Sequence, residues 1–165
     1  MIPLMLLVLV TLVAAVIDIK SRRIPNLLTG ALAFAGIAIH VPQGLIATLL
    51  AIAAMLIVFL IGSFAFSAGW FGGGDVKLIA ACCGLVGFPG SIPLVLEILL
   101  AGAFLALVTA AMRRQLIDLV RSTLDIVRFG AQGHQTGSLP YGVAIAAGSL
   151  TYALSTLVPA LRFSL

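Results

Sequence analysis

The chain has 165 residues, of which 62% are hydrophobic and only 8% are charged, and its formal net charge is +4 at pH 7. Soluble domains average about 45–50% apolar and about 25% charged residues. The composition therefore excludes an ordinary soluble domain and predicts a single integral-membrane domain over residues 1–165.

Six apolar segments follow one another along the chain, and we interpret each as a transmembrane helix. They are Ile2–Ile17, Leu27–Ile39, Gly44–Phe66, Val76–Phe88, Ile92–Met112 and Tyr141–Val158. A helix that crosses the hydrocarbon core needs about 20 apolar residues, so the second and fourth segments are short. The fourth covers only about 20 Å at about 1.5 Å per residue. Its inner end is therefore expected below the lipid surface, where irregular backbone must be covered by protein or water.

The basic residues predict the orientation of these six helices. With the N-terminus outside, eight of the nine basic residues fall in or beside the three inner loops. These eight are Lys20, Arg22, Arg23, Lys77, Arg113, Arg114, Arg121 and Arg128, which leaves only Arg162 outside. An excess of Lys and Arg on the cytoplasmic side is the usual bias of membrane proteins, so an outside N-terminus is favoured. This arrangement also argues against a nucleic-acid-binding surface.

The longest inner loop contains the stretch RRQLIDLVRSTLDIVRFG, in which apolar residues recur at helical spacing. Leu116, Val120, Leu124 and Val127 lie on one helical face, with most of the charged residues off that face. The pattern predicts a cytoplasmic amphipathic helix at the inner membrane surface. A helical extension of the fifth segment explains it equally well. The fold class is thus all-α and polytopic, with six transmembrane helices and this additional helix.

Two aspartates mark the same face of the predicted membrane domain. Asp18 follows the first segment and Asp75 precedes the fourth, so the topology places both at the inner side. Two carboxyl groups that meet near water can act as an aspartic protease, because the pair shares one proton and supplies both a base and an acid. Singly, acids at helix ends are commonly boundary residues. Because the chain has only five acids, and both aspartates adjoin helix-breaking sequence, the catalytic interpretation gains weight.

The stretch GWFGGGDVKL surrounds the second aspartate with unusual residues. Gly72, Gly73 and Gly74 predict a non-helical segment that lets a substrate backbone approach closely. Lys77 is expected to anchor the helix at the interface, or to pair with a phosphate or carboxylate. Because a helix dipole favours negative charge at its N-terminus and disfavours it at its C-terminus, we expect Asp75 to be ionised and Asp18 to hold the proton.

Three stretches together resemble the bacterial type IV prepilin peptidases: DIKSRRIPN, GGGDVKL and LPYGVAIAAG. The similarity is greatest to the short form that serves Flp, or tight-adherence, pili. It implies an aspartic endopeptidase of the bacterial inner membrane with Asp18 and Asp75 as the catalytic pair. Its partners would be prepilin and pseudopilin substrates and the pilus assembly machinery. The short basic leader would be cut at the cytoplasmic face, typically after a glycine.

The same resemblance assigns substrate-site roles to several residues and predicts that the chain does not methylate its product. Pro140 and Tyr141 match the third motif and are expected to shape the site, together with the glycines and Lys77. The long members of the family carry a cytoplasmic domain with paired C-x-x-C motifs and methylate the new pilin terminus. Nothing in this chain matches that domain. We therefore expect cleavage without methylation, with neither zinc nor S-adenosylmethionine as a cofactor.

The remaining polar and sulfur residues give weaker signals. Cys82 and Cys83 are adjacent in an apolar segment, a spacing typical of packing residues and not of a zinc or redox site. Glu97 lies about 9 Å inside the fifth segment and is expected to be protonated and hydrogen-bonded. Two non-enzymatic interpretations stay open: a small proton or ion carrier that uses the acids as a relay, and a structural membrane subunit of a secretion complex.

Overall fold

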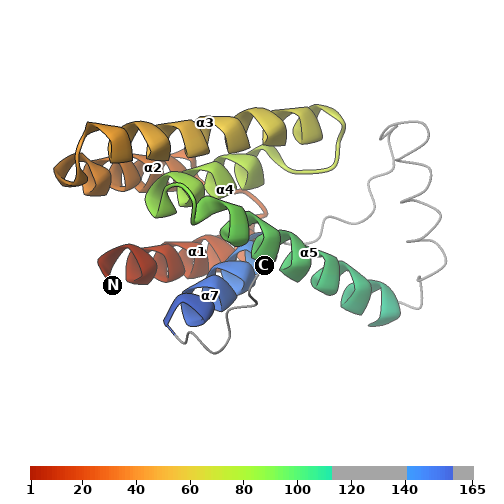
Figure 1. Ribbon diagram of the computed structural model, residues 1–165. Helices are drawn as coiled ribbons and strands as arrows, with labels where there is room; N and C mark the ends of the chain where they lie inside the picture. Colours follow the sequence, from red (N-terminus) through yellow and green to blue (C-terminus); the bar gives the residue numbers. More distant parts are fainter. Residues whose placement is uncertain (113–140, 158–165) are drawn as a thin grey trace.

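The computed structural model describes residues 1–112 and 141–157, and all regular structure in these ranges is helical. The elements are α1 (Ile2–Ser21), α2 (Asn26–His40), the short 3-10 helix η1 (Val41–Gln43), α3 (Leu45–Ser67), α4 (Gly73–Val86), α5 (Ser91–Met112) and α7 (Tyr141–Leu157). Successive helices run antiparallel (Figure 1). As a result α1 ends where α2, α4 and α7 begin. We call this the site end of the bundle, formed by residues 18–26, 68–75 and 141–142.

The helices coincide closely with the six predicted apolar segments. The largest difference is at the end of α1, which was predicted at Ile17 and lies at Ser21. Polar residues after Ile17 therefore continue the helix for another turn, and Asp18 lies inside this last turn. The helix stops because Arg22 adopts the left-handed conformation, with φ of 50° and its N–H bonded to the carbonyl of Asp18.

The glycine-rich stretch before Asp75 differs from its prediction. Gly72 alone is the extended N-cap residue, whereas Gly73 and Gly74 form the first turn of α4. The expected non-helical run is therefore wrong for these two residues. Close packing explains the lack of a side chain at Gly74, whereas a Cβ on Gly73 would meet only an ordinary contact. A Cβ on Gly74 would lie 3.2 Å from Cβ of Ile24, and one on Gly73 would lie 3.4 Å from the Phe66 ring.

Helix α4 forms the centre of the bundle. Its residues from Val76 to Leu85 are buried except for Lys77, and both Cys82 and Cys83 are fully buried free thiols, as predicted. At 14 residues it is about 21 Å long, well short of a hydrocarbon core of about 30 Å. A helix this short is stable because its neighbours surround it. Gly36 of α2 fits against the α4 backbone, since a Cβ there would lie 2.7 Å from N of Leu85.

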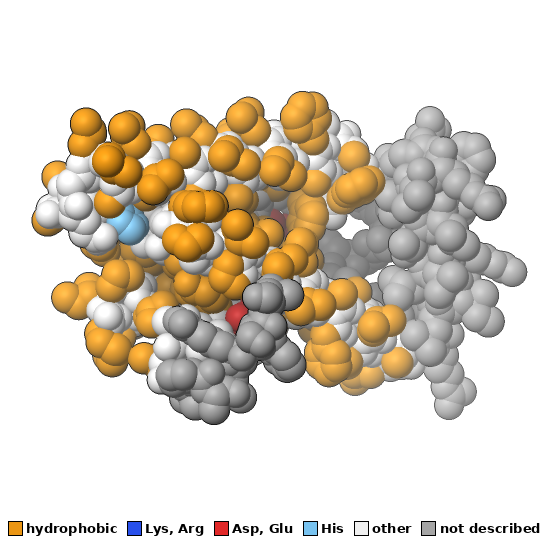
Figure 2. Space-filling model, viewed as in Figure 1, with side chains coloured by type: hydrophobic (Ala, Val, Ile, Leu, Met, Phe, Trp, Pro, Cys, Tyr) orange, Lys and Arg blue, Asp and Glu red, His pale blue; other side chains and the backbone are white. Residues whose placement is uncertain are grey.

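The exterior of the bundle is strongly apolar. Leu27, Phe34 and Phe64 are 84%, 76% and 76% exposed, and hydrophobic side chains cover most of the visible face in Figure 2. Within the described residues, three helices are long and apolar enough to cross a membrane: Ile2–Ser21, Leu45–Ser67 and Ser91–Thr109. The shorter helix Tyr141–Leu157 is also apolar. This surface is suited to lipid. The predicted amphipathic helix around Leu116–Val127 lies outside the described residues.

Two helix pairs pack closely through glycine residues. Gly148 of α7 sits against the α5 backbone, where a Cβ would lie 2.5 Å from Cα of Ile98, and Gly84 faces Met55 of α3. Nearby, Glu97 of α5 accepts a hydrogen bond from Oγ of Ser155 on α7 at 3.1 Å. The predicted hydrogen-bonded state of Glu97 is thus confirmed. Its other oxygen is buried without a hydrogen-bond partner among the described residues.

Candidate active site

Asp18 is held at the point where α1 meets the start of α7. It is only 7% exposed, and its Oδ2 accepts a hydrogen bond of 2.9 Å from the backbone N–H of Gly142. Gly142 is the second residue of α7. Asp18 lies in the last turn of α1, and its carboxyl group therefore contacts the N-terminus of α7. The contact is close because Gly142 has no side chain: a Cβ there would lie 2.9 Å from Cβ of Asp18.

Asp75 lies in the first turn of α4. Its carboxyl group folds back onto Gly72, where an added Cβ would lie 2.7 Å from Oδ2 of Asp75. The two aspartates are close enough for their charges to interact. The structure therefore brings the two predicted acids together at the site end, although they are separated by two helices in the chain.

An aromatic pair joins the third predicted motif to this site. The rings of Phe71 and Tyr141 meet edge to face with centroids 5.0 Å apart, an arrangement that aromatic pairs favour. The Tyr141 hydroxyl packs against Gly102 of α5, and the charge of Asp75 acts on it. Residues from α1, the α3–α4 loop, α4 and α7 thus converge on one place. Pro140, predicted beside Tyr141, lies outside the described residues.

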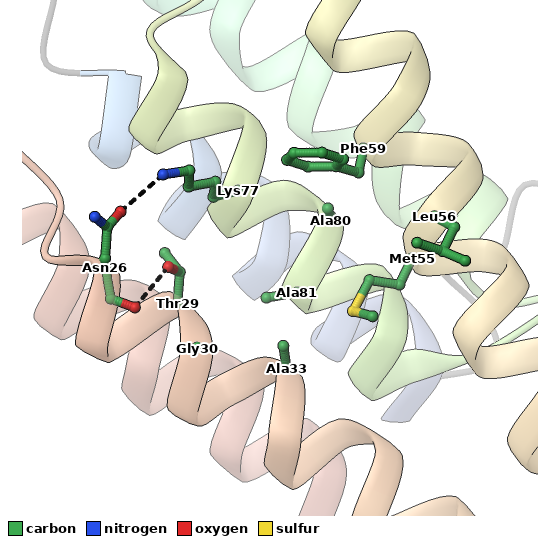
Figure 3. A pocket seen from close by; sticks show the side chains of 10 residues that line it. All are labelled: Asn26, Thr29, Gly30, Ala33, Met55, Leu56, Phe59, Lys77, Ala80 and Ala81. Carbon is green, nitrogen blue, oxygen red and sulfur yellow. Dashed lines mark hydrogen bonds between the residues drawn. The ribbon is translucent and has the colours of Figure 1, made fainter.

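Lys77 is the predicted site residue that the structure places elsewhere. It follows Asp75 by two residues, which turns it about 200° around α4, to the opposite face. There its Nζ donates a hydrogen bond of 2.9 Å to Oδ1 of Asn26 at the start of α2 (Figure 3). Lys77 therefore faces α2 and α3, and the two aspartates lie on the other side of α4.

The pKa of Asp75 argues against the expectation that this residue is the ionised member of the pair. Asp75 precedes the apolar segment that begins at Val76. Burial, followed by the nearby charge of Asp18, raises its pKa from 3.8 to about 6, despite a backbone hydrogen bond from Gly72 that lowers it. Asp18 accepts the N–H of Gly142 at the start of α7, a contact that its own helix does not supply. For Asp75 the dipole-based expectation was wrong because it omitted desolvation.

Three residues of the site were not predicted: Gly142, Phe71 and Ile24. Phe71 lies within GWFGGGDVKL and Gly142 within LPYGVAIAAG. Their contacts depend on how the α3–α4 loop and α7 pack, which the sequence motifs do not specify. Ile24 lies in the α1–α2 loop and covers Gly74. Among the described residues, no three His, Cys, Asp or Glu side chains come together in a way that could hold a metal ion.

The geometry supports a definite type of chemistry. A buried carboxylate next to a carboxyl group that holds its proton up to about pH 6 can provide a base and an acid on the two sides of one bond. The two charges interact, so their protonation is a property of the pair.

Comparison with known families agrees with this arrangement. The sequence model of the type IV leader peptidase family matches residues 5–110, a range that includes both aspartates and Gly72–Gly74 and ends before α7. Comparison with curated proteins and with solved structures gives no significant match. The matched range covers 106 of the 165 residues, well over half of the chain. The chain therefore belongs to the type IV leader peptidase family.

Proposed function

We propose that this protein is a membrane aspartic endopeptidase that removes the short basic leader from Flp-type prepilins and pseudopilins. The observation that carries the proposal is the meeting of Asp18 and Asp75 at the site end, with interacting charges, in a chain of the type IV leader peptidase family.

In this proposal the two acids have different tasks. Ionised Asp18 takes a proton from a water molecule, whose oxygen attacks the carbonyl carbon of the scissile peptide bond. Protonated Asp75 donates its proton to the carbonyl oxygen, which gives a neutral tetrahedral intermediate. The intermediate collapses when its nitrogen takes the proton from Asp18, the C–N bond breaks, and a hydroxyl proton returns to Asp75. The pair then regains its starting charge.

The surrounding residues suit an extended substrate. Gly72 is exposed and carries no side chain, so the substrate backbone can approach Asp75 closely. Gly74 allows Ile24 to pack tightly behind that approach, and Gly73 lies beside the ring of Phe66. Tyr141 and Phe71 form an aromatic wall beside the acids. We propose that these residues, with Pro140, bind the segment of the prepilin around the cleaved bond.

The proposed setting is the bacterial inner membrane, with six transmembrane helices and the N-terminus outside. The antiparallel order of the helices supports it, because Lys20, Arg22 and Arg23 lie at the site end and Lys77 follows it by two residues. The positive-inside bias then assigns this end to the cytoplasm. The substrate's basic leader would meet the acids there, and its apolar helix would remain in the bilayer. We further propose that the protein cleaves without methylating the product and works beside the pilus assembly machinery.

The test is leader removal in cells that express the full chain with a candidate Flp-type prepilin. We expect the wild type to shorten the prepilin on a gel, and both Asp18→Asn and Asp75→Asn to leave it uncut. Glu97→Gln is the matched control, because it also converts an acid to its amide but lies on α5 against Ser155. Leader removal by either aspartate variant would overturn the proposal and leave the carrier and structural-subunit interpretations. Intact-mass analysis of the product terminus tests the absence of methylation.

A further inference from the structure

A groove of about 350 Å³ lies on the face of α4 opposite the two aspartates, between α2, α3 and α4. Figure 3 shows its residues. The buried Ala80 and Ala81 of α4 form the floor, Gly30 and Ala33 of α2 form one wall, and Leu56 and Phe59 of α3 form the other. The volume is at the low end of the range for small-molecule sites, about 300–1,000 Å³. The lining is apolar, so the occupant must be apolar over most of its length.

The groove is open because its α2 wall lacks a side chain at one position. A Cβ on Gly30 would meet no heavy atom within 4 Å. Gly36 and Gly148 allow two helices to touch, whereas Gly30 adjoins open space. The residue before it, Thr29, is buried, with its hydroxyl bonded to the carbonyl of Asn26. The shape is therefore fixed by α2 itself.

One end of the groove carries a positive charge. Lys77 is exposed at the site end of the groove, and its Nζ donates a hydrogen bond of 2.9 Å to the neutral amide of Asn26. The amide orients the ammonium group without cancelling its charge. An ammonium group at the end of an apolar groove complements a molecule with an anionic head and a hydrocarbon chain.

We propose that this groove binds an anionic phospholipid, with one acyl chain between α2 and α3 and the headgroup phosphate on Lys77. The surroundings favour this occupant, because the exposed side chains of α2 include Leu27 and Phe34, which suit the hydrocarbon of a bilayer. A peptide substrate is less well suited, since the groove lies across α4 from the aspartates. The inference requires only that the chain lies in a membrane, so it does not depend on the proposed cleavage reaction.

The site has a structural link to the aspartates. Lys77 and Asn26 join α4 to the start of α2, and Ile24, two residues before Asn26, packs on Gly74 beside Asp75. A lipid phosphate on Lys77 would therefore hold the α1–α2 loop in place. We expect bound lipid to stabilise the whole site end, which makes thermal stability a second measure of binding.

The test uses the full chain purified in detergent, with phosphatidylglycerol and phosphatidylcholine of the same acyl chains added in turn. Native mass spectrometry measures the bound lipid, and thermal unfolding measures stabilisation. We expect phosphatidylglycerol to bind about fivefold more tightly, the preference that one lysine near an anionic headgroup supplies. Lys77→Gln should remove this preference, whereas Lys20→Gln, which changes a lysine outside the groove, should keep it.

A second pair of variants tests the groove itself. Gly30→Leu fills it and should lower the binding of both lipids, while Ala31→Leu, on the exposed side of the same helix, should not. Ala33→Leu is a second filling variant should Gly30→Leu fail to fold. Inorganic phosphate alone should give no stabilisation, because the acyl chain contributes most of the contact. Equal binding of the two lipids by the wild type, binding that survives both filling variants, or full stabilisation by phosphate alone would each overturn the proposal.

Discussion

The contact between Gly142 and Asp18 gives the sharpest prediction about the proposed reaction. Gly142→Ala places a methyl group 2.9 Å from Cβ and 3.0 Å from Oδ2 of Asp18, where ordinary contacts are 3.4–4 Å. The carboxylate must therefore move by about 0.5–1 Å, away from the N–H that it accepts. A displacement of about 1 Å at a catalytic group can cost about 100-fold in rate. We expect kcat/KM for leader removal to fall by about 10- to 100-fold.

The assay is cleavage of a purified prepilin in detergent, with the amount of folded enzyme fixed by thermal unfolding. Gly148→Ala is the matched control, since the same substitution on the same helix meets the α5 backbone at only 2.5 Å from Cα of Ile98. It should lower the melting temperature at least as much, yet keep nearly normal kcat/KM per folded molecule. Normal cleavage by Gly142→Ala, or an equal loss in both variants, would refute a positioning role for this contact.

Two further predictions concern the ionisable groups. Because Asp75 must hold a proton and its pKa is about 6, kcat/KM should fall with the loss of one proton as pH rises through about 6. The free energy of unfolding should also fall as pH rises. The folded state binds the Asp75 proton more tightly than the unfolded chain does. The stabilising contribution of Asp75 is therefore greatest below pH 3.8 and is lost as pH rises through about 6. A rate that rises through this window would contradict the assignment. Glu97→Gln should retain the hydrogen bond from Ser155 and the wild-type melting temperature. Glu97→Leu should lower the melting temperature by several degrees without changing kcat/KM per folded molecule. Equal melting temperatures for the two variants would show that the hydrogen bond does not contribute to stability.

The helices and the meeting of the acids follow from simple features of the sequence. Apolar runs mark each helix, and alternation across a membrane places Asp18 and Asp75 at one end whatever the details of packing. The contacts of α7 do not follow in this way, because Gly142 lies 124 residues from Asp18 and only tertiary packing joins them. The position of Lys77 was accessible, since two residues along a helix always point to nearly opposite sides. Lys77 was assigned to the substrate site because it belongs to the motif GGGDVKL.

The fold surrounds the two carboxyl groups with helix N-termini, which lower the energetic cost of a buried negative charge. Asp75 lies at the N-terminus of α4, and Asp18 accepts a bond from the N-terminus of α7, so two helix dipoles present their positive ends to the same two carboxyl groups. Together they reduce the cost of one buried negative charge. A second charge would add repulsion between neighbouring carboxylates in a poorly solvated place, and the raised pKa of Asp75 reflects this. Below about pH 6 Asp75 therefore holds its proton, and the proposed hydrolysis starts from this state.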